Sequence, residues 1–91
     1  MWAVVVRESG DQEQIEAIGE HLAANVAPRL RSAPGFVSAL WTSDGHGGTL
    51  NVIVFETEAA ASAAPERIGA APRPPFMQFE SAVVVRVLAN A

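Results

Sequence analysis

Three short apolar runs place the strongest limit on how this chain can fold. They are VVV at 4–6, VIVF at 52–55 and AVVVRVL at 82–88. Each is short and rich in β-branched residues, so each is predicted to lie in a strand. Their side chains do not alternate between apolar and polar, which is typical of strands covered on both faces. The chain is therefore expected to build a sheet with two apolar faces.

A helix is predicted over residues 11–35. Asp11 can cap its N-terminus, and apolar side chains recur at helical spacing to form one stripe. That stripe consists of Ile15, Ile18, Leu22, Val26 and Leu30. Pro28 lacks a backbone donor, so a kink is expected near Ala27.

A second helix is predicted over residues 57–71, with Thr57 as its N-cap and a kink at Pro65. Its surface is almost all Ala, which permits close packing on a sheet. The PRPP segment at 72–75 is expected to be a stiff connector to a last strand that begins near Phe79.

The order of elements predicts the topology. The first two apolar runs lie in strands expected at 2–7 and 49–56. Another strand is expected at 36–43, and DGHGG at 44–48 is expected to join it to the strand at 49–56 in a hairpin. The order β-α-β-β-α-β is that of the α+β, ferredoxin-like fold, an antiparallel four-stranded sheet with both helices on one face. The other, apolar face calls for a partner, and an identical sheet is the simplest one. We therefore expect residues 1–91 to form one domain of a homodimeric, dimeric α+β barrel.

Composition excludes several classes of function. The 91 residues include no Lys and six scattered Arg, with a net charge of −4, so no nucleic-acid surface is expected. Without Cys there is no disulfide or thiolate chemistry, and two isolated His give no metal site. The N-terminal segment has no basic start and an apolar run of only five residues, so no signal peptide or membrane span is expected. We expect a soluble, cytoplasmic protein.

The hairpin also offers a candidate binding site. If all five residues of DGHGG form the loop, Ser43 pairs with Thr49. Trp41 then lies directly across from Asn51 on the same face of the sheet. A large ring beside an amide is a suitable floor for an aromatic ligand. Alternatively, Trp41 is a core or dimer contact and Asn51 bonds the turn. A four-residue loop would change the register and separate the two.

His21 lies at the margin of the apolar stripe, where it could point into a pocket between helix and sheet. There it could serve as a base or proton shuttle near neutral pH. The alternative is a surface His that pairs with Glu16, Glu20 or Asn25. His46, by contrast, lies between Gly residues at the loop tip without an orienting partner, and the turn interpretation is favoured for it.

Arg86 interrupts an otherwise apolar strand. Such an Arg needs a carboxylate, a ligand or access to solvent. A ligand would make Arg86 a binding residue. The alternative is a salt bridge with Glu56 or Glu80, or a side chain that reaches solvent.

Over about residues 2–88 the chain resembles a known superfamily. SAPGFVSALW at 32–41 follows a helix, and a Gly-rich hairpin, LNVIVFETEAAASAA at 50–64 and a Val-rich last strand come after it. This succession is similar to the dimeric α+β barrel superfamily, and within it to proteins with an antibiotic biosynthesis monooxygenase domain. These motifs are specific for the fold but do not indicate which reaction the protein catalyses.

The resemblance implies a pocket between the helices and the sheet. In the oxygenases it holds an electron-rich aromatic or polyketide-type molecule, which reacts with O2 without metal or flavin, so no cofactor is expected. The residues usually involved are an Asn, a Trp and an Arg or His. The resemblance thus suggests His21 and Asn51 as catalytic residues and Trp41 and Arg86 as substrate-binding residues.

Two other branches of the superfamily bear on function. The haem-degrading branch uses an Asn on the first strand and a His on the second helix, and this chain has neither, so haem is not expected. Other members are small-molecule sensors or have no known activity. A non-catalytic dimer that binds a small ligand or only assembles is therefore the second hypothesis.

Overall fold

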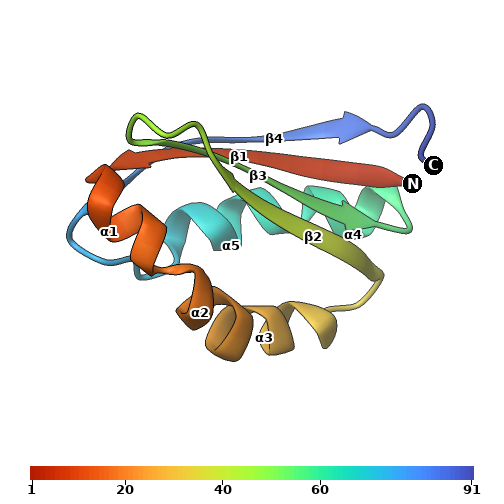
Figure 1. The fold of residues 1–91 in the computed structure, drawn as a ribbon. Coiled ribbons are helices and arrows are strands. Elements are labelled where there is room, and N and C mark those ends of the chain that lie inside the picture. The colour runs from red at the N-terminus through yellow and green to blue at the C-terminus, as the bar shows by residue number, and fades with distance from the viewer.

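Four strands form one antiparallel sheet in the computed structural model, which describes residues 1–91 (Figure 1). The strands are β1 (Trp2–Gly10), β2 (Phe36–Ser43), β3 (Gly48–Phe55) and β4 (Met77–Arg86). Their spatial order is β2-β3-β1-β4, so the central strands are β3 and β1. This is the ferredoxin-like arrangement, and the predicted α+β fold class is confirmed.

All helical segments lie on one face of the sheet (Figure 1). The first predicted helix consists of α1 (Gln12–Ala17), α2 (Gly19–His21), the π-helix η1 (Leu22–Val26) and α3 (Ala27–Arg31). The second consists of α4 (Glu58–Ser62) and α5 (Ala64–Ala70). None of these helices is long and apolar enough to cross a membrane.

Each predicted helix has one interruption next to a proline, and the first has another at Ile18, where there is no proline. Pro28 lies in the first turn of α3. Because it has no N–H to donate, the turn before it widens, and the N–H of Ala27 bonds to the carbonyl of Leu22. The interruption expected near Ala27 is therefore a π-turn. Pro65 likewise lies in the first turn of α5, just after the break at Ala63.

The two predicted N-caps are confirmed. The Asp11 carboxylate accepts a hydrogen bond from the N–H of Gln14 at 3.1 Å, and the Thr57 hydroxyl accepts one from the N–H of Ala60 at 3.1 Å. Each satisfies a backbone donor that the first helical turn leaves free. These caps fix where the chain leaves β1 and β3.

Several strand boundaries differ from the prediction. β3 starts and ends one residue earlier, and β4 ends at Arg86 rather than at residue 88. β1 continues past residue 7 to Gly10, because its polar end still pairs with β3 and β4. β4 begins at Met77 rather than Phe79, since the N–H of Met77 bonds to the carbonyl of Pro74 and turns the chain into the sheet. The longer β1 and the earlier start of β4 lengthen the sheet at the end where polar side chains gather.

The core lies between the sheet and the helices. Val4, Val6, Ile53 and Phe55 from the central strands pack against Ala61 and Ala64 from α4 and α5. Small Ala side chains let the helices approach the sheet closely, as expected from the Ala-rich sequence. Only nine residues of the chain are buried, so much apolar surface stays accessible.

The β2–β3 hairpin has the predicted register. Ser43 pairs with Thr49 and Trp41 pairs with Asn51, so the five-residue loop interpretation is confirmed. The Asp44 carboxylate closes the loop by accepting hydrogen bonds from the N–H groups of His46 at 2.6 Å and Gly48 at 3.0 Å. DGHGG is thus an ordered turn.

Candidate functional site

A cavity of about 790 Å³ lies between the helices and the sheet. Its wall comes from β1, β2 and β3, from the helical segments α1 to α3, and from α5 with the connector that follows it. Sites for small molecules usually measure about 300–1,000 Å³, so one drug-sized ligand fits here. More than half of the lining residues are hydrophobic, 14 of 27, which suits an apolar ring.

Trp41 and Asn51 both border this cavity from neighbouring strands. The Trp41 side chain is half-buried, whereas Asn51 is only 8 % exposed. The Asn51 amide donates a long hydrogen bond of 3.5 Å to Oε1 of Glu8. No protein group donates a hydrogen bond to its Oδ1, and Asn51 is one of the residues that line the cavity. The structure therefore brings the predicted ring and amide together in one wall.

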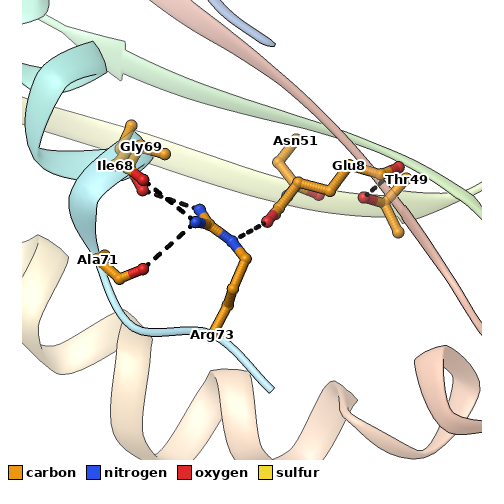
Figure 2. Close-up of polar contacts among 7 residues, drawn as sticks. All are labelled: Glu8, Thr49, Asn51, Ile68, Gly69, Ala71 and Arg73. Atoms are coloured by element: carbon orange, nitrogen blue, oxygen red, sulfur yellow. Dashed lines mark hydrogen bonds and ion pairs between the residues drawn. The ribbon is translucent and has the colours of Figure 1, made fainter. Parts of the chain in front are cut away.

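Glu8 and Arg73 form an ion pair in the same wall (Figure 2). Nε of Arg73 lies 2.8 Å from Oε2 of Glu8, and the two side chains are 20 % and 15 % exposed. Sequence reasoning missed both residues. They lie 65 positions apart, so no local pattern links them. The available signals were weak: a Glu that continues the apolar face of β1 and an Arg inside the Pro-rich connector.

Arg73 is held in place from several sides (Figure 2). Nη2 donates to the carbonyl of Ile68 at 2.8 Å, and Nη1 donates to the carbonyls of Gly69 and Ala71, each at 3.3 Å. The guanidinium also lies over the ring of Phe79, 5.0 Å from its centroid. The carbonyls at the C-terminal end of α5 carry partial negative charge, which favours this cation.

His21 lines the rim of the cavity, but its side chain is exposed. Asn25 Nδ2 lies 3.1 Å from Nδ1 of His21 and also donates to the His21 carbonyl at 3.3 Å. Pairing with Asn25 was one of the alternatives that the sequence left open. If Asn25 donates to Nδ1, the neutral ring carries its proton on Nε2.

Arg86 and His46 lie away from this site. Arg86 ends β4 opposite Trp2, is exposed and does not line the cavity. It forms no salt bridge with Glu56 or Glu80, so its guanidinium reaches solvent. His46 is exposed at the hairpin tip, where only its backbone N–H bonds to Asp44.

Comparison with known proteins places this architecture among solved structures. No family model matches the sequence, and no curated protein matches it. The haem-degrading protein MhuD of Mycobacterium tuberculosis, solved with two haems in its active site, matches with a TM-score of 0.72 and 15 % identity, over 100 % of this chain and 99 % of that one. This chain therefore shares the fold of that protein.

A monooxygenase of this fold is also similar. It comes from the gene ActVA-Orf6 of Streptomyces coelicolor, was solved with the ligand nanaomycin D, and matches with a TM-score of 0.63 and 19 % identity, over 99 % of this chain and 89 % of that one. The resemblance to antibiotic biosynthesis monooxygenase-type proteins is thus confirmed for the fold. At these identities the neighbours show the fold alone, and the chemistry has to be argued from the cavity.

The cavity offers haem few axial ligands. Haem iron needs an axial ligand such as His, Met, Cys or Tyr in the wall of its site. Among these residue types the cavity wall holds only His21, which is exposed at the rim beside Asn25, and Met77 at the start of β4. The buried part of the wall instead presents Glu8 and Asn51, which are polar but do not serve as axial ligands.

Proposed function

We propose that the protein binds an aromatic or polyketide-type small molecule in the cavity and acts as a cofactor-independent monooxygenase. The supporting observation is the cavity of about 790 Å³ with Trp41 and Asn51 side by side in its wall. Large side chains could have filled this space. Phe55 instead forms part of the wall and the core, and Phe36 and Phe79 do not line the cavity.

The reaction needs no bound redox group when the ligand is an electron-rich phenol. The ring C–H becomes a carbonyl, and the phenol itself reduces O2. One oxygen atom of O2 joins the ring and the other leaves as water, so α-naphthol plus O2 gives a naphthoquinone plus water. The protein has to hold the ring, exclude bulk water and move the phenolic proton.

In this proposal each side chain has a distinct role. Trp41 offers a flat apolar surface against which the ring of the ligand stacks. Asn51 presents the free Oδ1 to a polar group of the ligand. His21, at the rim, accepts the phenolic proton at Nδ1, where the phenol takes the place of the Asn25 amide, and passes a proton to solvent.

Oxygen uptake with α-naphthol in the presence of a metal chelator tests the proposal. The wild-type protein is expected to raise uptake above the buffer rate. His21→Ala should lower turnover about 100-fold, as for the loss of a general base, while the protein stays folded. His46→Ala removes the exposed His outside the cavity and serves as the matched control. No uptake above the buffer rate contradicts the oxygenase proposal.

A second candidate is a non-catalytic module that binds the ligand without oxidising it. The observation that favours it is the exposure of His21 and the contact between its Nδ1 and Asn25, which leave no imidazole base inside the cavity. Binding of α-naphthol under nitrogen, without oxygen uptake in air, would select this candidate.

We also propose that the protein is a homodimer and is cytoplasmic. Leu40 and Val83 are 61 % and 53 % exposed on the sheet face opposite the helices. Monomeric soluble proteins rarely expose a continuous apolar sheet face, and a second copy covers it most simply. Fractionation of cells that produce the protein tests the cytoplasmic location.

A further inference from the structure

Glu8 is a carboxylate on the apolar face of a central strand. Alternation along β1 puts it on the same side as Val4 and Val6, which are 0 % and 2 % exposed in the core. A charged side chain at such a position is costly unless it is paired and hydrogen-bonded. Its one ion-pair partner, Arg73, reaches it from the connector after α5. An apolar residue at position 8 would avoid this cost. This suggests a role of the Glu8 carboxylate in ligand binding.

The two oxygens of Glu8 are used unequally. Oε2 accepts the short hydrogen bond of 2.8 Å from Arg73, whereas Oε1 has only the Asn51 amide at 3.5 Å, which is the outer limit of a hydrogen bond. An ionised carboxylate can accept about four hydrogen bonds. Glu8 lines the cavity, and its side chain is 15 % exposed. It thus has acceptor capacity left for a ligand.

Arg73 holds this carboxylate in place and has few N–H donors left for a ligand. Its guanidinium has five N–H donors, and all but one are used by Glu8 and the carbonyls of Ile68, Gly69 and Ala71. The stack on Phe79 covers one of its faces. The ion pair therefore offers a ligand an acceptor rather than a cation.

We propose that Glu8, positioned by Arg73, selects the cavity's ligand by accepting a hydrogen bond from a hydroxyl or N–H group on an uncharged aromatic ring. This inference deepens the proposed function and rests on it only in requiring that the cavity binds an aromatic molecule. Arg29 and Arg67 also line the cavity, but their side chains are exposed. An anionic ring would have to be held there, away from the Glu8 carboxylate.

Calorimetric titration under nitrogen with three matched probes tests the selection without turnover. The probes are α-naphthol, α-methoxynaphthalene, which lacks the donor, and α-naphthoate, which is an anion. The wild-type protein should bind α-naphthol about 10-fold more tightly than α-methoxynaphthalene, as for one hydrogen bond to a charged acceptor. α-Naphthoate should bind most weakly.

Variants of both residues separate selection from stability. Glu8→Met should bind the two uncharged probes with equal affinity, and Glu8→Gln should keep a reduced preference, because a neutral amide is the weaker acceptor. Arg73→Gln should lower the preference and Arg73→Lys should restore part of it, whereas a purely structural role would change only the melting temperature. Glu56→Gln, which alters an exposed carboxylate outside the cavity, is the matched control.

The outcomes distinguish this inference from the proposed function. Equal binding of α-naphthol and α-methoxynaphthalene to the wild-type protein would refute the role of Glu8 and leave the aromatic cavity standing. Tightest binding of α-naphthoate would also refute it, in favour of the exposed Arg residues. Binding of none of the three probes would refute the proposed function itself.

Discussion

Trp41 lies directly across from Asn51 in the β2–β3 pair, and both side chains border the cavity. If the ring holds a ligand by stacking, Trp41→Ala should weaken the binding of α-naphthol about 10-fold, and Trp41→Phe should weaken it less. Calorimetric titration under nitrogen measures both. Trp2→Phe changes the other Trp, which does not line the cavity, and should leave the affinity unchanged. Unaltered binding by Trp41→Ala would place the ligand elsewhere.

The exposed sheet face predicts the assembly state. Leu40→Glu combined with Val83→Glu places two charges on that face and should convert the dimer into a monomer. Sedimentation velocity reports the change in mass. The control is Ala23→Glu, on the exposed side of the helices, which should remain dimeric. A wild-type protein that sediments as a monomer at micromolar concentration contradicts the homodimer proposal.

The stability of the hairpin loop should depend on the ionisation of Asp44 and should therefore decrease in acid. Backbone hydrogen bonds from His46 and then Gly48 lower the pKa of Asp44 below its ordinary value of 3.8, although slight desolvation opposes them. Because the folded-state pKa is depressed, this stabilisation is present above pH 3.8 and is lost as the pH falls through the folded-state value. Amide hydrogen exchange at His46 and Gly48, measured relative to unstructured peptides, should show protection that decreases in that acidic window. Asp44→Asn should remove this pH dependence.

Two Gly residues of the same loop form a matched pair for stability. Gly45 and Gly47 have φ angles of 82° and 89°, which other residues adopt at a cost of about 1–2 kcal/mol. A Cβ at Gly47 would lie 2.7 Å from the carbonyl oxygen of Gly10, whereas one at Gly45 meets nothing within 4 Å. Both substitutions should lower the free energy of unfolding. The loss should be larger for Gly47→Ala than for Gly45→Ala, and the difference should be about 1 kcal/mol or more. Urea denaturation of both variants measures the difference, and equal losses would mean that the loop shifts to relieve the contact.

Much of the fold followed from local patterns. The Val-rich runs, the caps at Asp11 and Thr57 and the Gly-rich loop each depend on neighbouring residues, and together they predicted the sheet and the pairing of Trp41 with Asn51. The break at Ile18 was not predicted, although Gly19, a weak helix former, follows it.

The candidate site was predicted less completely. Trp41 and Asn51 could be placed because one hairpin register relates them. Glu8 and Arg73 could not, because their contact depends on how the connector folds back onto β1, and that is set by the tertiary structure. Arg86 was selected for its residue type, and the register then placed it opposite Trp2 at the far end of the strand.

The π-turn at Leu22–Val26 also bears on how the cavity wall can tolerate a change in chain length. A π-turn holds one residue more than an α-helical turn, so removing one residue there would restore a regular helix. Because the change from a π-turn to an α-turn takes up the missing residue, the residues before it would keep their directions relative to α3. Ile18 and His21 would still border the cavity, and β2 and β3 would stay in place. A single codon lost in this segment would thus leave the cavity wall intact, whereas the same loss within α3 would rotate everything before it by about 100°.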